Sequence, residues 1–589
     1  MGRNESKARR ELQSTRDTFE SIWVAIVVAF VLRAFVVEAF VIPTGSMAPR
    51  LYGEHLQLTC PACGYSFAHG RVQSGRRARG PEDEPAPDAV CPTCGSRLDG
   101  RRERVRGGDR VLVMKYLYNY REPQPWDVVV FKNPQDNRQS YIKRLVGRPG
   151  EMIEIVHGNI FYRAGKDFSG DGVIDEADFR TPEAAADPDC AWRIRRKAPE
   201  AQQAMWQVVF DNDYQPDREV YERLNAGRGN GEPPRPPRWR ETAGHWDQKK
   251  RQDSGGRVFY YEGDEAGELT FEPGDRSRFL PHYGYNQRTA ESRGIDEDRD
   301  IVTDLQLSLV FRPESRESAV SLMLTSFEQE FIAEVHGDGT VLLSRRAEPG
   351  GALEEWGRAA LGALEPGRGV DVALAHADYR VELWVDGERV LASTPQQYDA
   401  NYARLKARME AVRQSPIPTP RAGISTWGGK SQLWHLRLMR DVYYTSPRTG
   451  LDQVPEGAYG DYFRKLRELN VIPSDPAGWG TTNNPIVLAK HPDRDHDLDE
   501  FFMLGDNSPQ SLDGRLWSSA APTLRLWRKD GQLLPKYEQG AEPIYKLGTV
   551  PRYSITGKAL FVYWPSGFPV PGLRSIPIVP NVGRMRFIR

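Results

Sequence analysis

The 589-residue sequence has little net charge, few histidines and cysteines, and few long apolar runs, and each of these shortages limits the kinds of protein that it can be. The net charge is -1 although 27% of the residues are charged, so the chain lacks the basic excess of a nucleic-acid-binding protein and no nucleic-acid partner is expected. There are only 10 histidines and five cysteines. Long apolar runs are also rare, because only Ile22 to Ile42 approaches the length that spans a bilayer.

Glycine and proline are plentiful, with 54 and 44 residues, and they separate short runs rich in Val, Ile, Tyr, Phe and Trp. Such runs between turn-forming residues predict a mainly β protein. The chain is too long for one ordinary core, so three or four folded units are expected.

The apolar run Ile22 to Ile42 predicts a transmembrane helix. It would extend roughly 30 Å, which is the thickness of a hydrocarbon core. Arg33 and Glu38 interrupt it near its C-terminal end, where a long side chain can reach the headgroups. A cleavable signal peptide is the alternative, although its apolar stretch would be shorter. The basic excess in residues 1–16 favours a cytoplasmic N-terminus, with the large C-terminal part on the outer face.

Three separated segments carry residues suited to catalysis. They are IPTGSMAPRLYG (Ile42 to Gly53), SYIKRLVGRPG (Ser140 to Gly150) and FFMLGDNSPQSLDGRLW (Phe501 to Trp517). None contains histidine, the usual base for a hydroxyl nucleophile, but a neutral lysine can remove the same proton.

The second segment offers such a lysine. Alternation along a strand would place Tyr141, Lys143 and Leu145 on one face. Burial against apolar neighbours would lower the pKa of Lys143 by several units from about 10.4. Arg144 would point the other way and stay solvated.

The three segments resemble the motifs of bacterial type I signal peptidases, the membrane-bound serine proteases that remove leader peptides from exported proteins. Residues 43–47 match the family's P-S/T-x-S-M motif, which implies that Ser46 is the nucleophile. The resemblance also implies an oxyanion hole made by the Ser46 N–H and the Thr44 hydroxyl. Lys143 matches the general base in the family's Y-x-K-R-x-x-G-x-P-G motif.

Residues 505–515 match the family motif G-D-N-x-x-x-S-x-D-S-R, with Gly514 in place of its second serine. The resemblance implies that Ser511 hydrogen-bonds to the lysine amine and orients it. It further implies a supporting ion pair between Asp513 and Arg515. The other supporting residues of this motif are Asp506 and Asn507.

The cysteines CPACG (Cys60 to Gly64) and CPTCG (Cys91 to Gly95) form two tight turns, each of which aims two sulfurs at one point. They predict a zinc ribbon in residues 59–106, with a structural zinc and no cofactor for catalysis. Two disulfides are the alternative in an oxidising compartment. The expected ligands are Cys60, Cys63, Cys91 and Cys94, which leaves Cys190 over.

The segment DFSGDGVIDEAD within residues 166–180 has the oxygen spacing of an EF-hand-type calcium loop, with Gly172 at the sharp turn. An acidic surface turn is the alternative. The candidate ligands are Asp167, Ser169, Asp171, the Val173 carbonyl, Asp175 and Asp178.

The largest interruption, residues 206–445, contains alternating apolar and polar runs separated by Gly/Asp turns, which predicts a β-sandwich. The segments YRVELWVDGERVL and WGGKSQLWHLRLMRDVYY resemble strands of a laminin-G or concanavalin-type jelly roll. That resemblance implies a glycan ligand, a protein ligand or a spacer role.

The expected organisation is a cytoplasmic tail (1–20), a transmembrane anchor (21–42) and an all-β catalytic core. The core is assembled from residues 43–58, 107–165 and 484–589. The ribbon, the calcium loop and the jelly roll interrupt it, and a linker with a short helix (446–483) follows the jelly roll.

The resemblance implies a serine endopeptidase in which Ser46 forms an acyl-enzyme while Lys143 accepts its proton and later activates water. The expected partners are signal peptides of exported preproteins and the lipid bilayer. The expected location is the bacterial inner membrane, crossed once, with the catalytic domain on the periplasmic side. Two alternatives are a peptidase of the same clan dedicated to one partner and an inactive membrane-anchored binding scaffold.

Overall fold

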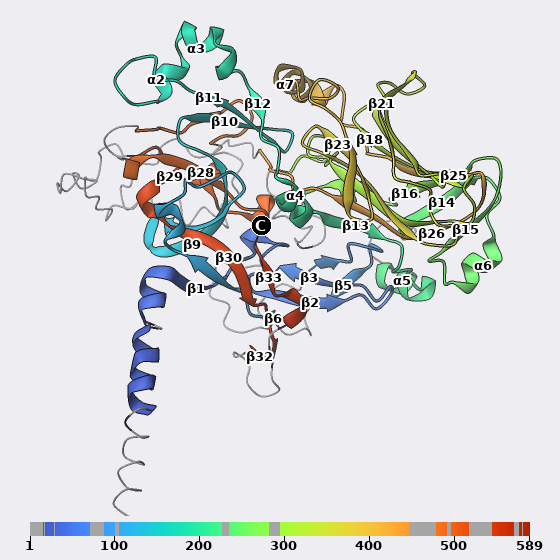
Figure 1. Ribbon diagram of the computed structural model, residues 1–589, viewed down its shortest axis with the longest axis horizontal. Coiled ribbons are helices and arrows are strands. Elements are labelled where there is room, and N and C mark those ends of the chain that lie inside the picture. Colours follow the sequence, from blue (N-terminus) through green and yellow to red (C-terminus); the bar gives the residue numbers. More distant parts are fainter. Residues whose placement is uncertain are drawn as a thin grey trace, which may run out of the picture.

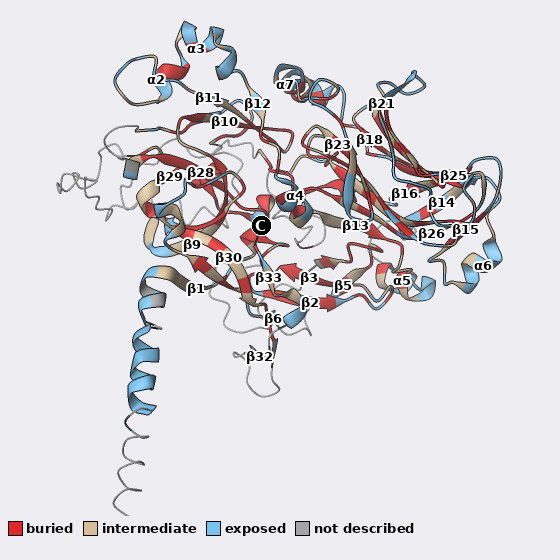
Figure 2. Cartoon of the chain, viewed as in Figure 1, coloured by how far each residue is buried: buried red, intermediate tan, exposed pale blue. Residues whose placement is uncertain are grey.

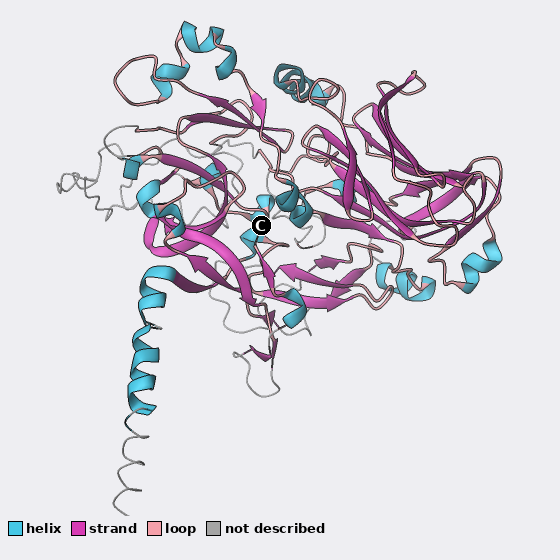
Figure 3. Cartoon of the chain, in the orientation of Figure 1, coloured by secondary structure: helices cyan, strands magenta, loops and turns pink. Residues whose placement is uncertain are grey.

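The structure is a computed structural model in which residues 16, 18–28, 30–70, 88–99, 105–226, 235–281, 285, 295–446, 479–491, 496–517, 545–569, 577–579 and 581–588 are described. Strands dominate it, which confirms the predicted mainly β class (Figure 3). The predicted helix of the linker lies outside the described residues.

An antiparallel sheet of eight strands brings the three sequence motifs together, in the order β1-β7-β30-β8-β9-β28-β29, with β33 beside β30. Its strands come from both ends of the sequence, so the long insertions leave and re-enter one sheet. They are β1 (Val37–Val41), β7 (Arg110–Met114), β8 (Val128–Asn133), β9 (Asp136–Gly147), β28 (Glu500–Leu504), β29 (Val550–Pro551), β30 (Ile555–Trp564) and β33 (Arg586–Phe587).

A smaller sheet has the order β12-β11-β10-β27 and also joins distant segments. It consists of β10 (Glu151–Val156), β11 (Asn159–Ala164), β12 (Arg193–Ile194) and β27 (Ile486–Val487). Buried apolar residues of this sheet, such as Ile153 and Ile486, share a core with Phe502 and Leu504 of β28. The two sheets therefore belong to one packed unit.

Residues 207–440 form two antiparallel seven-stranded sheets around one apolar core, in agreement with the predicted sandwich (Figure 2). Burial alternates along β17 because every second side chain points between the sheets. The first sheet contains β13 (Gln207–Asp211), β15 (Phe259–Gly263), β17 (Leu305–Pro313), β22 (Val370–Ala377), β23 (Arg380–Val385), β24 (Glu388–Ala392) and β26 (Gly429–Arg440). The second contains β14 (Arg238–Ala243), β16 (Gly267–Glu272), β18 (Ala319–Ser326), β19 (Gln329–His336), β20 (Thr340–Arg346), β21 (Leu353–Ala360) and β25 (Ala422–Trp427).

The short helices and the remaining strands lie outside these sheets. The helices are α2 (Glu176–Phe179), α3 (Pro182–Ala186), α4 (Pro199–Met205), α5 (Arg218–Asn225), α6 (Gln248–Asp253) and α7 (Tyr402–Glu410). Several of them, such as α2, α3 and α6, lie at the periphery (Figure 1). The remaining strands are β2 (His55–Thr59), β3 (Ser66–Gly70), β4 (Asp88–Val90), β5 (Arg97–Asp99), β6 (Val105–Arg106), β31 (Phe568–Pro569) and β32 (Pro577–Val579).

The predicted transmembrane run is divided between two kinds of structure. Residues 18–28 are helical, and Figure 1 shows this blue helix projecting away from the rest of the molecule. A π-helical turn, Leu32–Val36, follows, and Val37–Val41 is strand β1. The prediction of one helix through Ile42 is therefore wrong at its C-terminal end, because β1 pairs with β7 and Glu38 lies 3.4 Å from the Lys115 amine. Within the described part of the chain, no helix has both the length and the apolar character needed to cross a membrane.

Candidate active site

The side chains of Ser46 and Lys143 meet at a buried position beside strand β9 of the main sheet. Ser46 lies in a 3₁₀ turn, Gly45–Met47, and Lys143 lies on β9. The Lys143 amine donates a hydrogen bond to the Ser46 hydroxyl oxygen at 2.8 Å, and a second to the Ile142 carbonyl at 3.1 Å. Ser46 is 7% exposed and Lys143 is 4% exposed. A hydroxyl and an amine are thus in direct contact and shielded from water, which is the arrangement that a nucleophile and its base require.

Burial also changes the proton affinity of this amine. Removal from water lowers the pKa of Lys143 to about 8 from its ordinary value of 10.5. The negative charges of Asp513 and Asp506 oppose that effect. The amine can therefore be neutral near physiological pH, as a general base must be.

Asn507 holds the turn that carries Ser46. Its backbone N–H donates to the Ser46 carbonyl at 3.0 Å, and its side-chain amide donates to the Gly45 carbonyl at 2.9 Å. The approach is close, because a Cβ atom at Gly505 would lie 2.5 Å from the Ser46 carbonyl oxygen. A side chain at position 505 would push the two segments apart.

Ser511 does not make the contact that the family resemblance implies. Its hydroxyl is buried and has no hydrogen-bond partner within the described part of the chain, so the expected bond to the Lys143 amine is absent in this structure. The hydroxyl faces Gly505, where an added Cβ would approach it to 2.2 Å. The amine instead donates to Ser46 and to the backbone of its own strand.

Asp513 and Arg515 form a buried ion pair at 2.8 Å, the contact that the motif implies. Asp513 also accepts the Gly505 N–H at 2.9 Å. The remaining guanidinium N–H groups of Arg515 reach the Thr445 carbonyl at 2.7 Å and the Ser508 hydroxyl at 2.6 Å. The backbone N–H of Thr445 donates to the same hydroxyl at 2.8 Å. The end of the sandwich insertion is therefore bound to the loop that supports the dyad.

Arg144 is buried, which shows that the prediction of a solvated side chain is wrong. It is 0% exposed and binds both carboxylate oxygens of Asp506 at 2.7 Å. A third N–H donates to the Trp126 carbonyl at 2.7 Å. Strand alternation separated Arg144 from Lys143 correctly, but both faces of β9 are covered, so the opposite face is not solvent. The bidentate pair ties β9 to the loop of residues 505–515.

Thr44 lies directly before the serine turn and is exposed, and its hydroxyl does not cap that turn. Behind the turn, a Cβ atom at Gly45 would lie 2.5 Å from the Tyr285 hydroxyl oxygen, so Tyr285 packs closely there. Tyr285 belongs to the insertion, and its ring stacks on Tyr52 with centroids 5.8 Å apart. Nothing in the sequence indicates this contact, because more than 200 residues separate the two segments.

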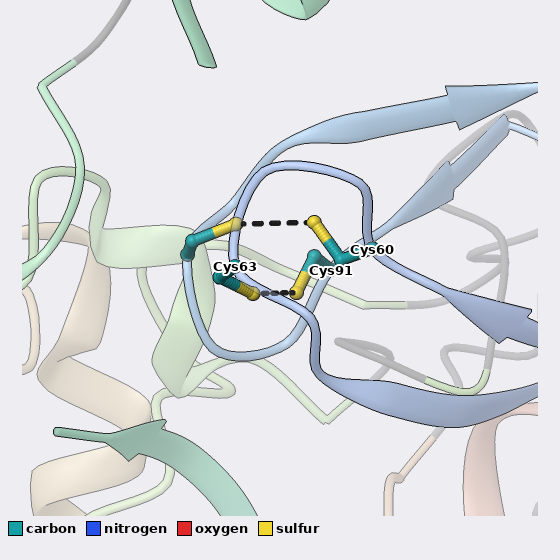
Figure 4. A group of neighbouring side chains, drawn as sticks. Cys60, Cys63 and Cys91 are labelled. Atoms are coloured by element: carbon teal, nitrogen blue, oxygen red, sulfur yellow. Dashed lines mark hydrogen bonds between the residues drawn. The ribbon is translucent and has the colours of Figure 1, made fainter. Parts of the chain in front are cut away.

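The four motif cysteines converge, and Figure 4 shows Cys60, Cys63 and Cys91 directed toward one point. The sulfurs of Cys60 and Cys94 are 3.5 Å apart, and those of Cys63 and Cys91 are 3.6 Å apart. All four sulfurs lie within 4.8 Å of one another, and every cysteine is a free thiol, so the alternative of two disulfides is wrong here. A tetrahedron with Zn–S bonds of about 2.3 Å has edges of about 3.8 Å, so the arrangement is compatible with structural zinc.

In the acidic loop, residues 166–180, backbone N–H groups of the loop donate hydrogen bonds to its own carboxylates. Asp167 accepts the N–H groups of Gly170 and Gly172, and Asp178 accepts those of Phe168 and Ser169. Across the described residues, no three side chains of this loop bring a carboxylate oxygen each within 4.8 Å of one another. Calcium binding stays a prediction from the sequence.

A known protein family matches the segment of the chain that carries Lys143. Residues 99–199 match the family model described as signal peptidase, peptidase S26. The segment includes Lys143 on β9 and the neighbouring strand β8. This part of the chain is therefore similar to the signal peptidase family.

The similar curated proteins are type I signal peptidases. A probable signal peptidase I-1 of Synechocystis sp. is 30% identical over 91 residues, covering 14% of this chain and 46% of the relative. Signal peptidase I of Rickettsia typhi is 26% identical over 162 residues, covering 27% and 47%. The chain thus spans about half the length of the curated relatives that it matches.

Solved structures of carbohydrate-binding and carbohydrate-cleaving proteins show weak overall similarity to this chain. The carbohydrate binding module CBM66 from Bacillus subtilis is 10% identical with a TM-score of 0.21, covering 34% of this chain and 94% of that one. The catalytic domain of a laminarinase from Thermotoga petrophila is 12% identical with a TM-score of 0.22, covering 40% and 98%. Similarities at this level do not define a function.

Proposed function

We propose that the chain is a membrane-attached serine endopeptidase that removes N-terminal signal peptides from exported preproteins. The observation that supports this most directly is the 2.8 Å contact between the Lys143 amine and the Ser46 hydroxyl in a buried setting. The family match and the similarity to type I signal peptidases support the same activity.

The proposed mechanism uses only this pair and the groups around it. The neutral Lys143 amine takes the Ser46 hydroxyl proton while the oxygen attacks the scissile carbonyl. The Ser46 N–H and the Thr44 hydroxyl are proposed to stabilise the negative charge on the carbonyl oxygen. The lysine then passes its proton to the leaving amine, and the acyl-enzyme forms. In the second half, Lys143 activates a water molecule that releases the new carboxyl end.

The first prediction tests the pair directly. Ser46→Ala and Lys143→Met should each reduce preprotein cleavage by at least a thousandfold, because one removes the nucleophile and the other its base. The measurement is cleavage of several unrelated preproteins by the full-length protein in detergent. Lys132→Met is the matched control, since Lys132 lies on the neighbouring strand β8 and is exposed. It should retain activity.

Each outcome of that assay separates the alternatives. Cleavage by either dyad variant would contradict the assignment. Cleavage of a single preprotein would favour a peptidase dedicated to one partner. A folded wild-type protein that cleaves none of the substrates would favour the inactive scaffold.

We also propose that the N-terminal helix attaches the protein to the inner membrane, with a cytoplasmic N-terminus and the catalytic part on the outer side. Its apolar side chains have no protein partner to cover them: Phe19 is 62% exposed, Trp23 is 64% exposed and Phe30 is 66% exposed. Exposed apolar residues in a row favour contact with lipid.

The second prediction is that serine at positions 19, 23, 27 and 30 together releases the protein from membranes in alkaline extraction. Serine at the exposed positions Leu353 and Leu361 of the sandwich should not. Retention of the quadruple variant in the membrane fraction would refute attachment by this helix.

A further inference from the structure

A cavity of about 660 Å³ lies where α4 meets the outward face of the first sandwich sheet. Its size is within the range of roughly 300–1,000 Å³ that is usual for small-molecule sites. Figure 1 shows α4 beside this sheet, near β13 and β23. Of the lining residues on β17 and β22, Ser308 and Ala373 lie on the face turned away from the sandwich core, whereas Leu309 and Val372 belong to that core.

Small side chains form the floor of the cavity. Ser308 pairs with Ala373, and Gln306 pairs with Ala375, on the neighbouring strands β17 and β22. Both strands have a hydrogen-bonded neighbour on each side, because β17 lies between β26 and β22, and β22 lies between β17 and β23. The floor is therefore the face of a sheet and not its edge. An extended peptide could not add to it as a further strand.

Two indole rings, those of Trp206 and Trp384, line the walls, and both are half-buried. The orientation of Trp384 is fixed because its indole N–H donates to Glu382 at 3.1 Å. The same carboxylate binds Arg380 at 2.8 Å, and Arg380 also lines the cavity. An indole held in this way offers a flat apolar surface beside fixed polar groups.

One polar group of the wall lacks a partner. Gln202 on α4 is 7% exposed, and its amide nitrogen has no hydrogen-bond partner among the residues that the structure describes. An unpaired buried donor costs free energy, so a ligand oxygen here would be stabilising.

The guanidinium groups of the cavity are already paired with carboxylates. Arg380 is bound to Glu382, and Arg437 lies 2.9 Å from Asp211. The His435 ring is also occupied, since its Nδ1 lies 2.6 Å from Asp213. The described lining therefore presents hydrogen-bonding groups and aromatic surface without a surplus of positive charge. An anionic ligand would find no cation to pair with.

We propose that this cavity binds a neutral saccharide, with a sugar ring against Trp384 and a hydroxyl oxygen on the Gln202 amide. A sugar presents both a flat face of C–H groups and a rim of hydroxyls, which is the combination that the walls and the floor match. The site is independent of the Ser46–Lys143 pair, so it adds a second function to the proposed peptidase.

The test uses the full-length protein in a detergent without a sugar headgroup, because a glycoside detergent would compete. An array of neutral and acidic oligosaccharides identifies binders, and calorimetry then measures the affinity for the strongest. Trp384→Ala removes an aromatic wall, and Ala373→Leu fills the floor while leaving every polar group in place. Each should weaken binding at least tenfold.

Trp427→Ala is the matched control, since Trp427 lies on β25 of the other sheet and does not line the cavity. It should change the affinity less than twofold. Preprotein cleavage by all three variants should equal that of the wild type, so a failure of saccharide binding is distinguishable from a failure of the peptidase assignment. The proposal is overturned if no neutral saccharide binds, if only acidic ones bind, or if folded Trp384→Ala and Ala373→Leu bind as the wild type does.

Discussion

The Lys143 side chain experiences two opposing influences. Burial disfavours its charged form, whereas Asp513 and Asp506 favour it, and burial has the larger effect. The amine therefore titrates near pH 8, where a base can be both neutral and able to take a proton.

The third prediction follows from the sign of this shift. Only the neutral amine accepts the Ser46 proton, so kcat/KM should rise with pH and level off above about 8. Below that point it should fall about tenfold per pH unit, as the protonated fraction grows. The measurement is cleavage of one preprotein between pH 5 and 10, with unfolding monitored at each pH. A midpoint near 10.5, the ordinary lysine value, would show that the active amine is solvated.

At the same scale, the sequence predicted some residues of the site and missed others. Ser46 and Lys143 could be placed because short motifs carry them. The environment of Arg144 could not, because strand alternation says which face a side chain takes and not whether that face is covered. Tyr285 and Thr445 contact the site through folding of a long insertion, and no local pattern reports such contacts.

At the scale of elements, the cysteine turns have the clearest sequence signal. Each turn has the same backbone pattern: Gly64 N–H donates to the Cys60 carbonyl at 2.8 Å, and Gly95 N–H to the Cys91 carbonyl at 2.9 Å. Glycine suits these positions because both have positive φ, 77° and 83°. The two turns end separate hairpins, β2–β3 and β4–β5, which supports the proposal of one structural zinc between them.

The fourth prediction concerns that metal. The purified protein should contain about one zinc per chain, and Cys63→Ser should remove it, because structural sites need all four sulfurs. Cys190→Ser is the control, since Cys190 is a free thiol outside the cluster. Elemental analysis and protease sensitivity of residues 59–106 measure the effect. A wild-type protein without bound metal would contradict the zinc proposal.

The N-terminal run shows what periodicity cannot resolve. A short apolar stretch fits a helix in lipid and a strand in a core equally well. Val37–Val41 becomes a strand because β7 offers five partner residues. This pairing cannot be predicted from the local sequence, because β7 lies far away in the chain. By contrast, the run Leu305–Pro313 alternates apolar and polar residues, which is the pattern of a strand, and it is one.

At the scale of the whole molecule, the insertion and the core are joined by buried charge. The Lys197 amine lies 2.6 Å from Asp378 and 2.8 Å from Asp441, and all three are buried. Lys197 follows β12 of the core, while Asp378 and Asp441 follow β22 and β26 of the sandwich. We infer that the two units unfold together.

The fifth prediction tests this coupling. Lys197→Met should lower the free energy of unfolding by about 3–5 kcal/mol, because two buried carboxylates lose their cation. Differential scanning calorimetry should show one transition for the wild type and a lower Tm, or two transitions, for the variant. Lys166→Met is the control, since Lys166 pairs with Asp187 at the surface and its loss should change the Tm little. An unchanged Tm in Lys197→Met would refute the coupling.

The bonds that Arg515 makes to Thr445 have a consequence for any shortened form of this protein. Excision of the sandwich at its borders would remove two acceptors from a buried guanidinium, whose ion pair with Asp513 would remain. A shortened chain that works must therefore supply a substitute oxygen for Arg515 at the junction.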